Sequence, residues 1–241
     1  MKKPVASIAV IFLFLTLSSF ADIQRISNAP ANLQYSFSLP VTDNTATVLY
    51  QSLELEVKGL SKEAFEYAWK GYQKLIANKQ VSNPGYLTIC DFSQSSKQKR
   101  LYLIDINNET VVMNTWVAHG RNSGLDYATR FSNTPESLQS SLGFYITRQT
   151  YTGEHGLSLK VQGLEPGFND KAFQRAIVIH GADYIGAQRM NNSSFMGRSY
   201  GCPAVPKEES AALINTIKNG TCLFIYHPSK KYLANSKILN D

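Results

Sequence analysis

The run Ala-Ile-Val-Ile-His-Gly at residues 176–181 is followed by Arg-Ser-Tyr-Gly-Cys at residues 198–202. The first run is apolar up to His180 and is typical of a buried strand. The second places a single cysteine, Cys202, behind a glycine and a hydroxyl residue. A thiol needs a base to become a thiolate nucleophile, and imidazole is the usual one. The two runs therefore predict a cysteine–histidine pair for nucleophilic catalysis, in which the histidine comes first in the chain.

This order separates the chain from papain-like hydrolases, in which the cysteine precedes the histidine. His180 followed by Ser199-Tyr200-Gly201-Cys202 resembles the catalytic motif of the YkuD-like L,D-transpeptidases, which cross-link bacterial peptidoglycan. Within that family the chain resembles the murein L,D-transpeptidase catalytic-domain branch, over roughly residues 85–228. The segments that carry this further resemblance are 117–120, 131–133, 140–145 and 156–159.

The resemblance implies a mainly β fold, a β-sandwich of mixed sheets, with an N-terminal helical segment and a few peripheral helices. It also implies the reaction. Cys202 attacks the stem-peptide carbonyl that precedes a terminal D-Ala, D-Ala leaves, and an amine of another stem accepts the acyl group. His180 serves as base and acid, oriented by the backbone carbonyl of Gly181.

The same resemblance assigns the surrounding loop. Backbone N–H groups of Tyr200, Gly201 and Cys202 are expected to hold the oxyanion, and Ser199 to hold the loop by hydrogen bonds. The usual motif has histidine in place of Tyr200, and it has Arg or Asn where this chain has Ala204.

Five further residues are expected to contact the substrate. Arg198 is the natural substitute for the cation that the motif normally carries after its cysteine, because a guanidinium suits carboxylates and an oxyanion. The others are His119, Asn133, Tyr151 and His155. No short spacing joins the histidines in the way metal-ligand pairs require, so we expect no metal and no other cofactor.

The N-terminus has the pattern of a secretory signal peptide. Lys2 and Lys3 precede the apolar run 5–17, and Ser19-Phe20-Ala21 is a small-x-small cleavage site. An uncleaved anchor is the alternative, since the run approaches membrane-spanning length. With cleavage we expect a periplasmic or wall-associated protein, without stable insertion in the membrane.

We expect four parts along the chain: a signal peptide at 1–21, an extended or flexible lead at 22–44, an N-terminal helical segment at 45–84 that packs on the core, and the catalytic domain at 85–241. A hydrophobic content of 43% indicates a globular core. The net charge is +6 before cleavage, and the excess suits an anionic wall or membrane surface better than nucleic acid in an exported protein.

Periodicity predicts the elements. A helix capped by Ser61 runs to about residue 77, and a second helix runs from 206 to about 218. Residues 47–57 fit either a helix or a strand. Strands are predicted at 86–91, 101–106, 110–117, 144–151, 157–162, 176–180 and 222–227. Three cysteines make an odd count, and we interpret Cys90 and Cys222 as buried, unpaired thiols.

There are three alternatives to an L,D-transpeptidase. An L,D-carboxypeptidase would use water as the acceptor at the same site. A sortase-like enzyme needs an arginine after its cysteine, and no arginine follows Cys202. A non-catalytic wall-binding module would fit the missing motif residues. If the site is catalytic, a carbapenem should acylate Cys202.

Overall fold

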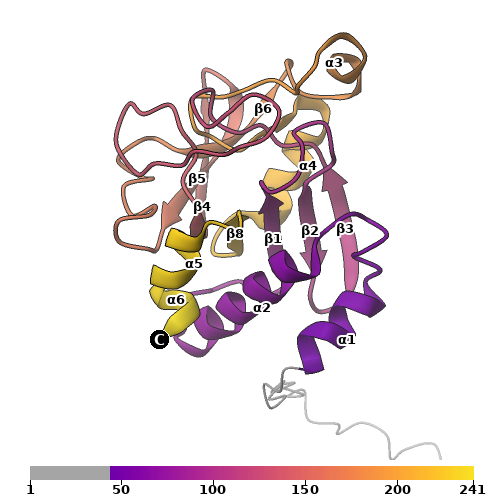
Figure 1. Ribbon diagram of the computed structural model, residues 1–241, viewed down its shortest axis with the longest axis vertical. Helices are drawn as coiled ribbons and strands as arrows, with labels where there is room; N and C mark the ends of the chain where they lie inside the picture. The colour runs from indigo at the N-terminus through magenta and orange to yellow at the C-terminus, as the bar shows by residue number, and fades with distance from the viewer. Residues whose placement is uncertain (1–43) are drawn as a thin grey trace, which may run out of the picture. The chain divides into compact units, whose positions relative to one another are not determined.

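A computed structural model describes residues 44–241, without the side chains of residues 190–192. The predicted signal peptide and the lead up to residue 43 lie outside this part. The strands are β1 (Tyr86–Asp91), β2 (Leu101–Asp105), β3 (Thr110–Thr115), β4 (Gly143–Gly153), β5 (Gly156–Gly163), β6 (Val178–Ala182), β7 (Ala204–Pro206) and β8 (Cys222–Tyr226). The helices are α1 (Asn44–Ser52), α2 (Lys62–Ala77), α3 (Ala187–Asn192), α4 (Lys207–Ile217), α5 (Lys230–Asn235) and α6 (Lys237–Asn240) (Figure 1).

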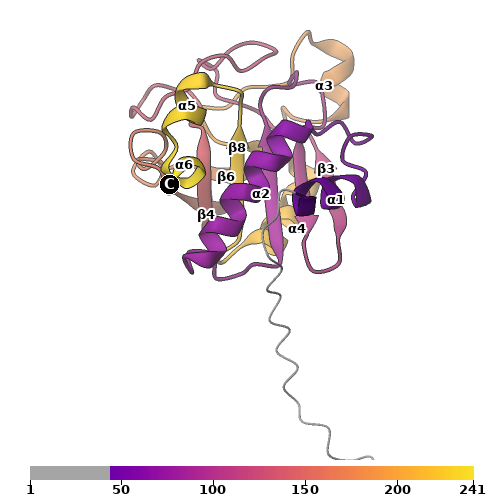
Figure 2. The same ribbon diagram turned by 60° about the horizontal axis from the view of Figure 1, so that its bottom comes forward.

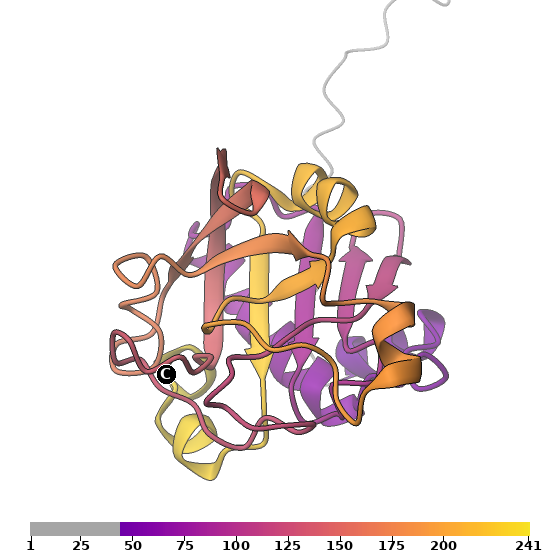
Figure 3. The same ribbon diagram turned by 90° about the horizontal axis from the view of Figure 1, so that it is seen from above.

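The strands form one mixed sheet in the order β3-β2-β1-β8-β4-β5-β6-β7. The pairs β1–β8 and β6–β7 are parallel and the other pairs are antiparallel. The sheet curls, and β6 and β7 run across the direction of β1, β2 and β8 (Figure 3). The predicted mainly β fold with mixed strand pairing is confirmed, and its eight strands belong to one continuous, curved sheet.

Helix α2 covers one face of this sheet and packs on β1 and β8 (Figure 2). It begins where the sequence predicts, because the Ser61 side chain accepts a hydrogen bond from the Ala64 N–H at 3.2 Å. Its buried face includes Phe65, Ala68 and Trp69. Gly71 sits so close to the Phe144 ring that a Cβ there would lie 1.9 Å from it.

Most predicted strands are present within a residue or two of the expected bounds. The undecided segment 47–57 begins as the end of α1 and continues as turns. The short elements α3, β7, α5 and α6 were not predicted. Three or four residues of β7 or α6 carry too little periodicity to reveal an element.

The segment that follows β3 pairs with β7 and with the residues just before it. Ala118 forms an isolated antiparallel bridge with Ala204 of β7, with its N–H donating to the Ala204 carbonyl at 2.8 Å. Gly120 forms a parallel bridge with Ser199. We refer to residues 117–121 as the strap, because these bridges hold it against both ends of the segment that contains Cys202.

A fully buried guanidinium, that of Arg100, binds the strap through hydrogen bonds. Arg100 donates through Nε to the Val117 carbonyl at 3.2 Å and through one terminal nitrogen to the same carbonyl at 2.9 Å. That nitrogen also lies 2.7 Å from His119 Nδ1, and the guanidinium stacks 4.8 Å from the Phe92 ring centre. Since a guanidinium only donates, Nδ1 of His119 must accept, and the ring must be neutral.

Burial and the neighbouring Arg100 charge lower the pKa of His119 to about 4. An unfolded chain protonates this residue at about 6.5, so the unfolded state binds more protons between these two values. The contribution of His119 to stability is therefore complete above about pH 6.5 and is lost as the pH falls toward 4.

We expect His119→Gln to reduce the acid sensitivity of the fold. The amide oxygen of glutamine accepts from Arg100 but does not titrate. Urea unfolding at pH 7.5 and pH 4.0 should show that the wild type loses on the order of 2–3 kcal/mol more than the variant. Equal losses in the two proteins would show that His119 is not the acid-sensitive group.

Candidate active site

The segment 199–204 is held between the strap and β6. Ser199 N–H donates to the His119 carbonyl at 3.0 Å, and Arg121 N–H donates to the Ser199 carbonyl at 2.7 Å. Beyond the cysteine, Ala204 pairs in parallel with His180 of β6. Both ends of the segment are therefore fixed by main-chain hydrogen bonds, and the intervening Cys202 is set beside β6.

Side-chain hydroxyls fix the turn itself. Ser199 Oγ donates to the Cys202 carbonyl at 2.6 Å and accepts from the Gly201 N–H at 3.0 Å. The buried Ser140 accepts from the Gly120 N–H at 3.0 Å and donates to the Gly201 carbonyl at 3.3 Å. Ser199 thus has the loop-holding contacts that the sequence predicts for it, and Ser140 is a second clamp that the sequence did not reveal.

Gly201 meets two constraints at once. Its φ is +126°, a conformation that side chains disfavour. A Cβ at this position would also lie 2.8 Å from the Gln139 carbonyl oxygen. Any side chain would therefore displace the backbone next to Cys202.

The Cys202 thiol is half-buried against the start of β6. Its sulfur lies 3.5 Å from the Val178 N–H donor and 3.9 Å from the Ala176 carbonyl, to which the thiol donates. Burial raises the pKa of Cys202 above the ordinary thiol value, while the Val178 N–H and the nearby Arg175 charge oppose that rise. At neutral pH the resting group is therefore a thiol.

Arg175 is the cation on this side of the thiol, and the sequence analysis did not identify it. Its guanidinium donates to the Gln139 carbonyl at 2.7 Å and to the Ser132 carbonyl at 2.8 Å. It also lies 3.3 Å from where a Gly201 Cβ would stand. Arg175 lies in a turn five residues before His180, and nothing in the local sequence pattern indicates that its side chain would lie near Cys202.

His180 lies in β6 and is almost fully buried. Its Nδ1 is 3.0 Å from the Gly181 carbonyl oxygen, which only accepts, so Nδ1 carries the proton and Nε2 is the free base. This contact matches the expectation for Gly181. Burial is the main cause that lowers the pKa of His180, and the Gly181 carbonyl opposes it. No hydrogen bond joins His180 to Cys202 within residues 44–241.

His155 covers the imidazole of His180. It projects from the exposed turn between β4 and β5, and the two rings stack with centroids 4.2 Å apart and planes 18° apart. A positive charge on His155 lowers the pKa of His180 further. His155 therefore lies against the predicted base, and its expected substrate contact stays a prediction.

The expected oxyanion donors divide into two groups. The Gly201 N–H is already bound to Ser199 Oγ, so that part of the expectation is corrected. Among the residues that the structure describes, the N–H groups of Tyr200 and Cys202 have no hydrogen-bond acceptor. These two remain available to an oxygen at the site.

Arg198 points toward the strap and the loop that follows it. One terminal nitrogen donates to the Arg121 carbonyl at 2.8 Å and to the Gly124 carbonyl at 3.2 Å. Its guanidinium also stacks over the Phe195 ring at 4.8 Å. Arg198 therefore has a structural role in holding these loops, and its expected substrate contact stays a prediction.

The other three residues expected to contact the substrate, His119, Tyr151 and Asn133, do not lie beside Cys202. His119 is fully buried under the strap, which is a correction, since the Arg100 guanidinium occupies its ring nitrogen. Tyr151 is 39% exposed on β4, two strands from β6, with Lys160 stacked 5.5 Å from its ring.

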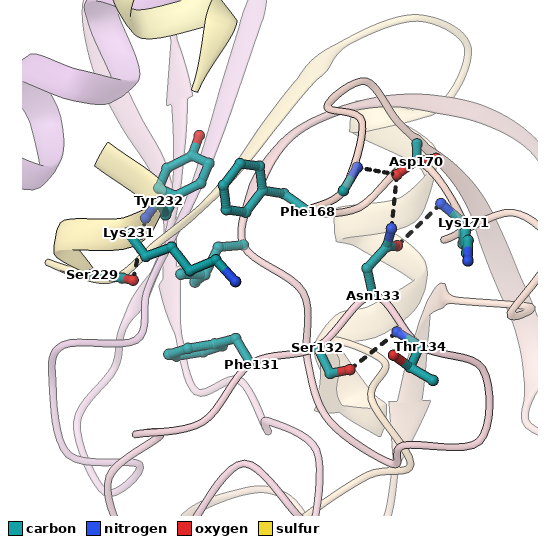
Figure 4. Close-up of a pocket in the computed structure, with 12 residues that line it drawn as sticks. Phe131, Ser132, Asn133, Thr134, Phe168, Asp170, Lys171, Ser229, Lys231 and Tyr232 are labelled. Atoms are coloured by element: carbon teal, nitrogen blue, oxygen red, sulfur yellow. Dashed lines mark hydrogen bonds between the residues drawn. The ribbon is translucent and has the colours of Figure 1, made fainter. Parts of the chain in front are cut away.

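Asn133 lines a different pocket, of about 390 Å³, together with Phe131, Phe168 and Tyr232. Figure 4 shows its amide turned toward Asp170 and Lys171. Its Nδ2 donates to the Asp170 carboxylate at 2.7 Å, and its Oδ1 accepts from the Lys171 N–H at 3.1 Å. Asn133 is therefore corrected to a residue that links two loops away from the thiol.

Cys90 and Cys222 are free and fully buried, as interpreted from the sequence. Burial raises the pKa of Cys90 to about 12 and also raises that of Cys222. In the part of the chain that the structure describes, no helix is long and apolar enough to cross a bilayer, and no three acidic, histidine or cysteine side chains gather as metal ligands.

We expect His155→Ala to raise the pKa of His180 toward its ordinary value of about 6.5, because the variant exposes the ring and removes a neighbouring charge. The ring signals of His180 in an NMR titration measure this. His155→Phe is the matched variant, since it keeps the cover and removes only the charge, and its shift should be smaller. An unchanged midpoint in both variants would contradict the coupling.

We expect iodoacetamide to alkylate only Cys202 in the folded protein. Because burial raises its pKa, the rate at pH 7 should be lower than that of an unstructured cysteine peptide and should climb through pH 9. Mass spectrometry after digestion identifies the site, and unfolding in urea should expose Cys90 and Cys222. A faster rate than the peptide at pH 7 would show that the resting group is a thiolate.

Comparison with known proteins places this arrangement in a family. The model of the L,D-transpeptidase catalytic domain matches residues 56–226. No curated protein matches the chain.

Solved structures of L,D-transpeptidases are similar at low identity. One from Mycobacterium smegmatis is 9% identical with a TM-score of 0.37, and the similarity covers 59% of each chain. LdtMt1 in complex with imipenem is 10% identical with a TM-score of 0.36, again over 59% of each chain. One from Xylanimonas cellulosilytica is 15% identical with a TM-score of 0.34, over 75% of this chain and 93% of that one.

The chain thus spans about three-fifths of the length of the first two of these proteins. The family match itself covers well over half of the chain, from the turns that follow α1 to the end of β8. The chain belongs to the L,D-transpeptidase catalytic-domain family.

Proposed function

We propose that this protein is an exported peptidoglycan L,D-transpeptidase that works through an acyl-enzyme on Cys202. The observation that carries the proposal is the fixed tautomer of His180. Its Nδ1 proton is bound by the Gly181 carbonyl, which leaves Nε2 as a buried base on the strand beside the cysteine. Family membership supplies the substrate class, peptidoglycan stem peptides.

In the first half-reaction the Cys202 proton passes to His180 Nε2 as the sulfur attacks the carbonyl between a diamino acid residue and D-Ala. The carbonyl oxygen becomes an oxyanion, to which the free N–H groups of Tyr200 and Cys202 would donate. The C–N bond then breaks, the imidazolium gives its proton to the leaving D-Ala amine, and a thioester remains.

In the second half-reaction an amine of another stem peptide attacks the thioester. His180 takes the amine proton, the C–S bond breaks, and the proton returns to the Cys202 sulfur. Water in place of the amine gives an L,D-carboxypeptidase from the same intermediate. The two activities therefore share every residue named here and differ only in the acceptor.

The pKa directions bear on when the proton moves. Burial raises the pKa of Cys202 and lowers that of His180, so the resting pair is neutral. Proton transfer becomes favourable when the developing oxyanion and the C–S bond stabilise the charge. The pair is thus suited to act during attack rather than to store a thiolate beforehand.

We expect Cys202→Ala to abolish turnover while preserving the fold, because no other residue is placed to form the thioester. The purified protein is incubated with a tetrapeptide muropeptide, and products are read by mass spectrometry. Loss of D-Ala with a cross-linked product indicates transpeptidation, and loss of D-Ala alone indicates trimming. Cys222→Ala, at a buried thiol outside the site, is the matched control and should keep activity.

A carbapenem gives a second readout of the same thiol. Its strained lactam carbonyl should acylate Cys202 once, and the adduct should be absent from Cys202→Ala. A folded Cys202→Ala protein that still releases D-Ala would refute the mechanism. A wild-type protein that neither turns over nor is acylated would favour a non-catalytic wall-binding module.

A further inference from the structure

A second pocket, of about 330 Å³, opens beside the segment that carries Cys202. Three arginines line it, Arg121 from the strap, Arg189 from α3, and Arg198. Its other walls are largely aromatic and are formed by Tyr184, Phe195, Gly197 and Tyr200. We refer to it as the arginine pocket. None of the described residues that line it is acidic.

The charge of this pocket is not neutralised internally. Among residues 44–241, no carboxylate lies within ion-pair distance of any of its three guanidinium groups. The two acidic residues of the adjoining segments are otherwise engaged. Asp126 accepts from Ser95 and Ser96, and Asp183 pairs with Lys207 at 3.0 Å. Three cations that share one cavity without a counter-ion favour an anionic ligand.

The arginine pocket also adjoins the thiol. Tyr200, two residues before Cys202, forms one wall and is 68% exposed, with the Arg121 guanidinium 5.9 Å from its ring centre. Tyr184 forms another wall. A ligand in the pocket would therefore lie next to the chain segment that carries Cys202.

The three arginines are not equivalent. Arg198 is held by two main-chain carbonyls, so it is placed in advance. The Arg121 side chain is exposed and makes no side-chain hydrogen bond within the described residues, although its backbone is fixed by Ser199. Arg121 is thus free to close on a ligand, and its replacement removes the cation–π contact with Tyr200 but no side-chain hydrogen bond.

We propose that the arginine pocket binds free carboxylates of the stem peptide, so that the enzyme discriminates acidic stems from stems whose carboxylates are amidated. This inference rests on the proposed function, since it takes its ligand from the same substrate. Guanidinium groups bind a carboxylate through paired, charge-assisted hydrogen bonds that a carboxamide cannot supply in the same geometry. The aromatic walls exclude water from one side of those bonds and provide apolar contact for the peptide.

The test measures binding without turnover. Calorimetry on Cys202→Ala protein compares an acidic tetrapeptide stem with the same peptide in which its isoglutamyl and diamino acid carboxylates are amides. The acidic peptide should bind about tenfold more tightly or better, as expected for a charge-assisted contact. Its advantage should shrink at high salt.

Arg121→Gln in the same background should remove most of that preference and leave binding of the amidated peptide within about twofold. Arg130→Gln is the matched control, because it removes the same charge from an exposed position outside the pocket. Equal affinity for the two peptides, or equal loss in both arginine variants, would overturn the inference.

Turnover by the wild type separates this failure from failure of the proposed function. If the wild type releases D-Ala from both peptides at the same kcat/KM, the proposed reaction stands and the proposed carboxylate pocket is refuted. If the wild type binds the acidic peptide selectively but never releases D-Ala, the carboxylate pocket stands and the proposed reaction is refuted.

Discussion

The buried guanidinium of Arg100 is the contact on which the site geometry depends. It has no carboxylate partner at ion-pair distance in the described chain and instead binds the Val117 carbonyl and the neutral ring of His119. Leaving such a charge without hydrogen-bond partners inside a protein costs several kcal/mol. Any movement of the strap that separated these acceptors from Arg100 would carry that cost. They belong to the strap, and the strap carries the bridges to Ser199 and Ala204. The position of Cys202 is therefore set by a charge buried on the opposite side of the strap.

The candidate site separates two tasks that the proposed cysteine mechanism must combine. Main-chain pairing and the hydroxyls of Ser199 and Ser140 fix the backbone around Cys202, while His180, the proposed acid–base group, lies in β6. Gly201 lets these elements approach, because its φ of +126° and the nearby Gln139 carbonyl leave no space for a side chain. The backbone of the candidate site is thus fixed by hydrogen bonds, whereas side chains such as Arg121 and Tyr200 are exposed and can adjust to a ligand. That division is consistent with one acyl-enzyme chemistry and a variable acceptor.

The sequence predicted the helices and strands better than the contacts around the candidate site, and the reactivity of Cys202 and His180 stays a prediction. The Ser61 cap, the strands β1 to β6 and β8, and the Gly181 contact of His180 follow from local patterns or from the motif. Arg175, Ser140 and the stacking of His155 on His180 depend on loops that meet only after the sheet has curled. Asn133 and His119 were misplaced for the same reason, since their partners Asp170 and Arg100 are remote in sequence. Local periodicity carries no information on such encounters.

The two structural thiols have a consequence for how the protein is produced. Cys90 and Cys222 lie on β1 and β8, which are parallel neighbours although they come from opposite ends of the domain, and the sheet protects each thiol only once that long-range pairing has formed. Until then three oxidisable thiols coexist on one unfolded chain, and an oxidising medium can join any two of them as a disulfide. Nascent chains that meet oxidant early would be trapped as covalent misfolds, so recovery of active protein should depend on keeping a reductant present until the sheet has closed.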